Sequence, residues 1–240
     1  MARRIRNIAT LFTLAALAVG PANAGAWTAT WYASPQAAWG ADFPLPTGVP
    51  ALLERQTVRE TARISVGGAR VRIVLSNRYG MQPVLVGAAR VARAAPSSGA
   101  VGVQLTFGGL PQATIAPGAP LVSDPVDLRV SALDRLAVSV YLPHATPLST
   151  FHWGAQQTGW IDAGDKTAAP LSEPIALHGR ALLAGVLVES DVHRDVVVAL
   201  GDSITDGNGS TPDQDRRWPD YLAATTCTRA MPATKQSPPQ

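Results

Sequence analysis

Residues 57–76 read TVRETARISVGGARVRIVLS, and this stretch decides the fold class. Apolar and polar side chains alternate on either side of the glycine pair, a pattern typical of half-buried strands. Two such runs separated by Gly67 and Gly68 predict a β-hairpin, because glycine tolerates the positive φ of tight hairpin turns. The stretch therefore predicts antiparallel β-structure.

Further runs of the same kind surround this stretch. They are residues 27–33, 84–92, 101–107, 126–130, 136–142 and 182–189. Turn residues such as Pro117 and Gly118 separate them, and none has a helical period. Short strands at regular spacing predict a mainly β domain over residues 25–190, a β-sandwich with a jelly-roll-like layout.

The first 24 residues have the features of a secretory signal peptide. Arg3, Arg4 and Arg6 precede an apolar run over residues 8–19, and residues 22–24 read ANA, a small-residue cleavage site. The apolar run is too short to span a membrane, which takes roughly 20 residues. We therefore expect cleavage after residue 24 and a secreted or periplasmic protein, without stable membrane insertion. An uncleaved N-terminal anchor is the alternative.

Net charge gives no indication of nucleic-acid binding. The chain has 20 basic and 17 acidic residues and a formal charge of +3. Cleavage would remove three arginines and leave 17 of each sign, so no basic surplus remains. Cys227 is the only cysteine, which excludes an intrachain disulfide.

A second pattern begins near residue 194. Residues 196–207 read VVVALGDSITDG, and their apolar run has no alternation, as in a parallel strand covered on both faces. A glycine-containing turn follows, and residues 218–224 predict the start of a helix, with Pro219 near its first position. We expect residues 194–224 to form the first strand, turn and helix of an α/β, flavodoxin-like domain. Residues 225–240 are rich in Thr and Pro and are expected to be disordered.

The turn presents Ser203 where such a domain would place a nucleophile. A serine that directly follows a strand lies at the strand's carboxyl end, the edge at which α/β sheets bind ligands. Gly201 lets the chain turn tightly, and free backbone N–H groups there can stabilise an oxyanion. The structural alternatives are that Ser203 caps a helix and that Asp202 forms an ordinary Asx-turn.

The block 199–207, with Gly201, Asp202 and Ser203 at its centre, resembles the nucleophile block of SGNH (GDSL) hydrolases. Residues 209–220 are similar to a secreted branch of that family, and residues 57–79 to the β-domain that precedes its catalytic domain. The resemblance covers roughly residues 27–224. It implies a carboxylic ester hydrolase (esterase, lipase or acylhydrolase) with Ser203 as nucleophile and its N–H as one of three oxyanion donors.

The family's later blocks have no counterpart here. They supply a glycine and an asparagine as further oxyanion donors and an Asp-x-x-His motif for the base, whereas no histidine follows Ser203. His144, His152, His178 and His193 all precede it. We therefore expect an inactive or severely impaired enzyme whose family-like part ends near Ala224, as after a frameshift or premature stop. A short binding protein, or a serine site completed by another chain, is the alternative.

The runner-up function is a non-catalytic secreted β-sandwich that binds carbohydrate or a partner. It depends on the tryptophans of the β-domain, since aromatic platforms stack on sugars. These are Trp27, Trp31, Trp39, Trp153 and Trp160. Exposed, coplanar rings would favour this function, and buried rings would count against it. Neither function requires a metal or a cofactor, and the first acts on a small-molecule or polysaccharide ester.

Overall fold

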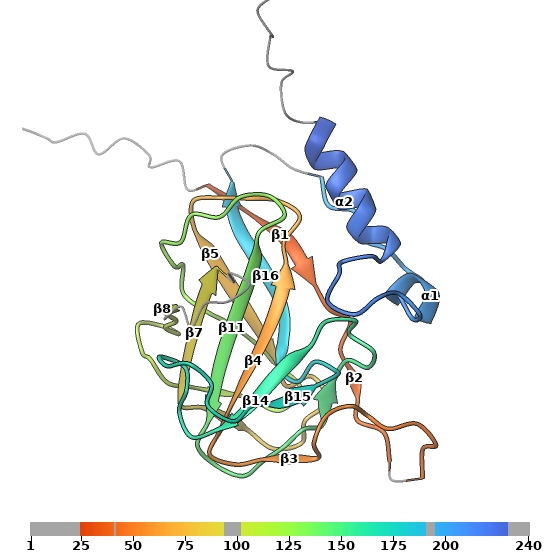
Figure 1. Cartoon of the computed structure of the whole chain (residues 1–240). Helices are drawn as coiled ribbons and strands as arrows, with labels where there is room; N and C mark the ends of the chain where they lie inside the picture. Colours follow the sequence, from red (N-terminus) through yellow and green to blue (C-terminus); the bar gives the residue numbers. More distant parts are fainter. Residues whose placement is uncertain (1–24, 41, 94–101, 191–194, 230–240) are drawn as a thin grey trace, which may run out of the picture.

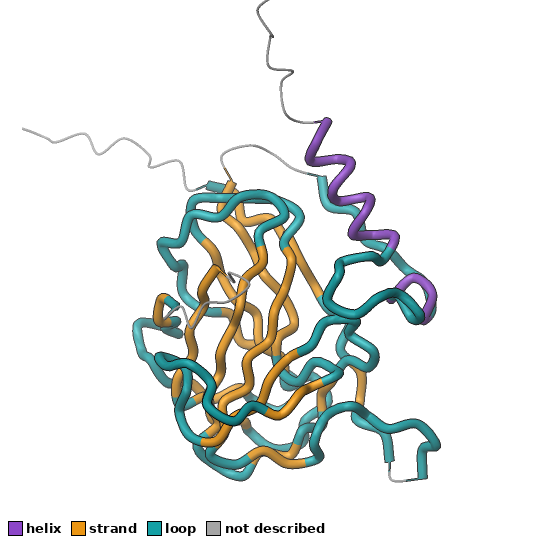
Figure 2. Tube along the Cα trace, in the orientation of Figure 1, coloured by secondary structure: helices purple, strands orange, loops and turns teal. Residues whose placement is uncertain are grey.

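The structure, a computed structural model, describes residues 25–40, 42–93, 102–190 and 195–229 (Figure 1). The predicted signal peptide, His193 and residues 230–240 lie outside the described residues. The chain is mainly β, as its alternating runs predict, with several sheets and two helices near the end of the described residues (Figure 2). We call residues 25–190 the β-domain and residues 195–226 the C-terminal segment.

Two antiparallel sheets make up most of the β-domain. The first has four strands in the order β1 (Ala26–Tyr32), β16 (Leu183–Ser190), β5 (Val71–Ser76) and β10 (Pro120–Val122). The second has six in the order β15 (Ile175–Leu177), β14 (Gly159–Ala163), β4 (Gln56–Arg63), β11 (Arg135–Leu142), β7 (Ala88–Arg93) and β8 (Val103–Gln104). The longest pairing joins β11 to β4 from Arg135↔Arg63 to Leu142↔Gln56.

Three two-stranded pairs complete the β-structure. They are β12 (Thr146–Pro147) with β3 (Leu52–Leu53), β13 (Thr150–Phe151) with β2 (Gln36–Ala37), and β6 (Val84–Val86) with β9 (Ala113–Ile115). The run 84–92 is thus divided at Gly87, and residues 126–130 form only isolated bridges, at Val126 and Val130.

The predicted hairpin around the glycine pair is wrong. Strands β4 and β5 lie in different sheets, so Gly67 and Gly68 connect the two layers. A Cβ on Gly67 would lie 2.5 Å from the carbonyl oxygen of Val130, and one on Gly68 would lie 2.3 Å from that of Glu189. Glycine is therefore required here for close backbone approach, and not for a positive φ.

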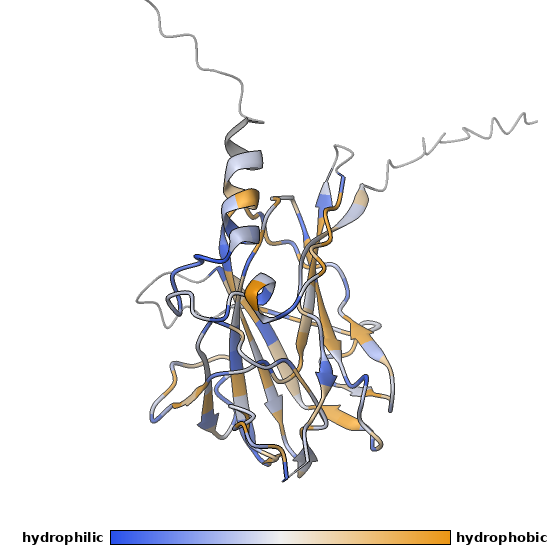
Figure 3. Cartoon of the chain, turned by 90° about the vertical axis from the view of Figure 1, so that its right-hand side faces the viewer, coloured by the Kyte–Doolittle hydropathy of each residue, from blue (hydrophilic) through white to orange (hydrophobic). Residues whose placement is uncertain are grey.

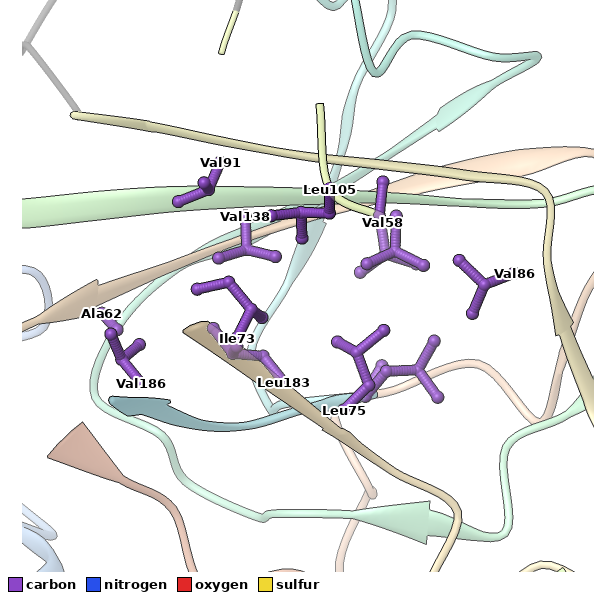
Figure 4. Close-up of a cluster of buried hydrophobic side chains, with 14 of the residues drawn as sticks. Val58, Ala62, Ile73, Leu75, Val86, Val91, Leu105, Val138, Leu183 and Val186 are labelled. Carbon is purple, nitrogen blue, oxygen red and sulfur yellow. The ribbon is translucent and has the colours of Figure 1, made fainter. Parts of the chain in front are cut away.

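The core lies between the two main sheets (Figure 4). Apolar side chains from both sheets meet there and are almost fully buried, because each strand alternates its inward and outward side chains. They include Val58, Ala62, Ile73, Leu75, Val86, Val91, Leu105, Val138, Leu183 and Val186. Val71, Ile73 and Leu75 thus share the inward face of β5, as their alternation predicts.

Both helices lie along one flank of the β-domain (Figures 1 and 3). Helix α1 spans Ser203–Asp206, and α2 spans Trp218–Arg229. Helix α2 begins as the sequence predicts, but it continues beyond Ala224 into the segment expected to be disordered. No helix among the described residues is both long and apolar enough to cross a membrane.

Candidate active site

The apolar run that precedes the serine is not a strand. Residues 195–201 have no strand assignment, and the run 196–200 pairs with no strand of the described chain. Its side chains face solvent, with exposed fractions of 84% for Val198 and 97% for Leu200. The predicted first strand of an α/β domain is therefore wrong for this structure. A buried parallel strand needs hydrogen-bonded neighbours and helices on both faces, and the described residues supply neither here.

The serine nevertheless lies in a well-formed turn, residues 201–209, which we call the serine turn. Asp202 caps α1, since its Oδ1 accepts a hydrogen bond from the N–H of Ile204 at 2.9 Å. Gly207 ends the helix with a φ of 97°, and its N–H donates to the carbonyl of Ile204. The N–H of Asn208 donates to the carbonyl of Ser203 at 2.7 Å. These bonds define the turn locally.

Ser203 is the first residue of α1 and is exposed. Because Asp202 holds the cap, the alternative in which Ser203 caps the helix is not realised. Within the described residues, neither Oγ nor the N–H of Ser203 has a hydrogen-bond partner, so both are free to meet a ligand. Gly201 lies close to Thr205, whose Oγ1 would be 2.1 Å from a Cβ at position 201.

A histidine of the β-domain contacts the serine turn. His152 Nε2 lies 3.1 Å from Oδ1 and 3.0 Å from Oδ2 of Asp206, which is the last residue of α1. The other ring nitrogen, Nδ1, lies 2.7 Å from the backbone carbonyl oxygen of Ser34. From the sequence, Asp206 is expected to shape the turn without a catalytic role, and His152 is expected to lie in the β-domain. No local pattern connects the two residues, which are 54 positions apart.

Two arginines surround the same carboxylate. Asp206 interacts electrostatically with Arg180 of the β-domain and with Arg217 of the C-terminal segment. Burial lowers the pKa of Arg180 to about 10, although attraction to Glu60 opposes that change. Arg217 is held by Asp220, which accepts its Nε–H at 2.9 Å. The carboxylate of Asp206 thus interacts with two arginines as well as with His152.

Two further aspartates fasten the C-terminal segment to the β-domain. Asp213 accepts hydrogen bonds from the N–H of Thr158 at 2.6 Å, its hydroxyl at 2.7 Å and the side-chain amide of Gln157 at 2.9 Å. Asp215 accepts from Nε of Arg135 at 2.9 Å and lies 3.7 Å from Nε of Arg63. These contacts between the C-terminal segment and the β-domain are all hydrogen bonds or ion pairs.

Asp213 and Asp215 also hold an unusual backbone. Their φ values are 62° and 49°, the left-handed region that aspartate adopts more readily than most residues. Each carboxylate makes the contacts described above from this conformation. The left-handed backbone at these two residues therefore accompanies the attachment of the C-terminal segment to the β-domain.

No histidine of the described chain hydrogen-bonds to Ser203. His144 and His178 are exposed, and His152 is engaged with Asp206 and Ser34. The described residues also contain no group of three or more His, Cys, Asp or Glu side chains placed to hold a metal ion. The serine therefore has free donor and nucleophile groups but no base in contact.

The tryptophans do not form an exposed platform on the first sheet. Trp27 and Trp31 are half-buried on β1, and each is covered by a guanidinium group. Arg72 Cζ lies 4.7 Å from the ring centroid of Trp27, and Arg180 Cζ lies 4.5 Å from that of Trp31. Such cation–π contacts occupy the faces that a sugar would need.

A second group of aromatic side chains pack against one another, although Phe43 is 44% exposed and Trp39 and Trp153 are only half-buried. Trp39 lies 4.0 Å from Phe43, 5.3 Å from Phe151 and 5.9 Å from Trp153, all between ring centroids. The ring planes are tilted or perpendicular to one another, not coplanar. Trp160 is 39% exposed and stands apart from these contacts. The arrangement does not favour a stacking site for carbohydrate.

In comparisons with known proteins, the chain matches no family model and no curated protein.

Proposed function

We propose that this chain carries the nucleophile of a serine-dependent carboxylic ester hydrolase of the SGNH type, with Ser203 as the attacking residue. The observation that carries the proposal is the exposed serine turn. Its Gly201-Asp202-Ser203 block presents an unpartnered hydroxyl and an unpartnered N–H on the same residue. The hydroxyl attacks the ester carbonyl and releases the alcohol, and water then hydrolyses the acyl-enzyme to the acid. No metal or cofactor is required.

With the described residues alone, we expect the proposed reaction to be slow. A serine hydroxyl is a weak nucleophile unless a base removes its proton, and no histidine of the described residues contacts Ser203. Within the described residues, the serine turn offers the free N–H of Ser203 as an oxyanion donor. Binding and one backbone donor alone leave a rate far below that of a complete triad.

The remaining parts of the proposal concern setting and architecture. The two-sheet β-domain is a jelly-roll-like sandwich in this proposal. The C-terminal segment would form the entry of a flavodoxin-like domain only if residues 196–200 became a strand beside a parallel neighbour. The protein is exported to the periplasm or the medium by its N-terminal signal. Its substrate is a small-molecule or polysaccharide ester and not a nucleic acid, since the exported chain has no basic surplus.

Covalent labelling of Ser203 tests the proposal most directly. A fluorophosphonate probe should modify the wild-type chain at Ser203, as located by mass spectrometry, and should not modify Ser203→Ala. Ser131→Ala, which removes an exposed hydroxyl from the β-domain, is the matched control and should label like wild type. Hydrolysis of p-nitrophenyl acetate should be slow and should fall to background in Ser203→Ala. Equal labelling of the wild type and Ser203→Ala would refute the proposal.

A further inference from the structure

The contact between His152 and Asp206 joins two parts of the molecule that are distant in sequence. His152 lies in the β-domain, where its backbone pairs with that of Arg180 in an isolated bridge. Asp206 lies three residues after the proposed nucleophile, on the same short helix. Residues three apart on a helix share a face, so this contact fixes the face that carries Ser203.

Both nitrogens of the imidazole ring face hydrogen-bond acceptors. Nδ1 faces the carbonyl oxygen of Ser34 at 2.7 Å, and a carbonyl can only accept a hydrogen bond. Nε2 faces both carboxylate oxygens of Asp206, which also only accept when ionised. A ring that carries a proton on Nε2 therefore donates to Asp206.

We infer that His152 is a positioning residue that holds the serine turn on the β-domain through Asp206. Arg180 and Arg217 also interact with Asp206. Neither one replaces the ring, since the hydrogen bonds described for their guanidinium groups go to the backbone of Thr61 and to Asp220. The role of His152 in placing a nucleophile rests on the proposed function, but the contact itself does not.

Amide hydrogen exchange on the full chain tests the inference without any substrate. Protection of the Asp206, Gly207 and Asn208 amides should fall at least about tenfold in His152→Ala, which corresponds to about 1.4 kcal/mol. His144→Ala, which alters an exposed histidine, should behave like wild type.

Asp206→Asn provides a second variant with a different expected result. An asparagine oxygen can still accept a hydrogen bond from Nε2, so protection of the turn should lie between that of wild type and that of His152→Ala. Wild-type protection in His152→Ala would overturn the inference. The fluorophosphonate reaction separates the two proposals. A turn that loses protection in His152→Ala but whose Ser203 never labels would refute the proposed hydrolase and leave the positioning contact intact.

Discussion

The β-domain and the C-terminal segment are held together by different forces. The β-domain encloses a core whose side chains, such as Ile73, Leu75 and Val186, are fully buried. No described residue of the C-terminal segment belongs to that core, and the segment is attached through the carboxylates of Asp206 and Asp213 and their neighbours. Burying one aliphatic side chain is worth about 1.5–3 kcal/mol, whereas a partly exposed ion pair contributes about 0–1 kcal/mol.

This difference implies that the two regions open independently. A segment held by a few polar contacts opens locally at a small free-energy cost, while the β-domain opens only by global unfolding. Changes in the core should therefore disturb both regions, because the docking surface is lost with the domain. Changes in the docking contacts should disturb the segment alone.

The largest expected effect is in the core of the β-domain. Ile73→Ala removes a fully buried side chain between the two sheets and should lower the free energy of unfolding by about 2–5 kcal/mol. For a domain of this size the melting temperature should fall by roughly 4–20 °C, as measured by circular dichroism. The C-terminal segment should become protease-sensitive in the same transition. A change under about 2 °C would show that the core does not hold the domain together.

A buried carboxylate gives the β-domain a pH dependence of its own. Asp162 on β14 accepts hydrogen bonds from the N–H of Ser172 at 2.5 Å and of Ala163 at 2.8 Å. The bond from Ser172 is the largest cause of the lowered pKa of Asp162, and burial opposes it. A pKa lowered on folding stabilises the fold at neutral pH, and this stabilisation is lost as the pH falls from the unfolded value of 3.8 through the folded pKa.

Asp162→Asn should therefore cost about 1.5–3 kcal/mol at pH 7, because the hydrogen bonds no longer go to a charged group. Denaturant unfolding at several pH values measures the difference between variant and wild type. That difference should shrink below about pH 4, where the wild-type carboxylate also becomes protonated. A constant difference down to pH 2 would mean that Asp162 does not titrate in this range.

The docking contacts should respond without the β-domain. Asp213→Ala removes three hydrogen bonds to Gln157 and Thr158 and places alanine at a positive φ. Cleavage within residues 195–226 by a trace of protease should accelerate at least about fivefold, as for a loss of roughly 1 kcal/mol in local stability. Asp213→Asn, which tolerates the same backbone, should show a smaller acceleration. A parallel fall in the melting temperature of the β-domain would contradict the independence of the two regions.

Short apolar-rich runs were the most reliable guide to the fold. Residues 136–142, which alternate, and residues 182–189, which are almost wholly apolar, predict strands that the structure confirms as β11 and β16. The pairing partners were less predictable. Gly67 and Gly68 satisfy the local pattern of a hairpin, yet their role is set by Val130 and Glu189, which lie far away in sequence.

The candidate site shows the same limit. The motif located the serine turn and Asp202, since cap and turn residues act locally. It gave no indication that Asp206 meets His152, because residues 54 positions apart come together only through the tertiary fold. Residues 196–200 have the composition of a buried strand, but composition predicts burial only where neighbouring elements exist to provide it.

That exposed run provides the smallest expected effect. Val198 is 84% exposed, so Val198→Ser exchanges an apolar for a polar group in solvent and should change stability by no more than about 0.5 kcal/mol. Val186→Ser, the same exchange at a fully buried position on β16, is the matched control and should unfold much of the β-domain. Thermal melting and the rate of cleavage within residues 195–226 are the measurements. If Val198→Ser destabilised the protein as Val186→Ser does, residues 196–200 would be a buried strand in solution. The division between an apolar core and a polar attachment would then fail.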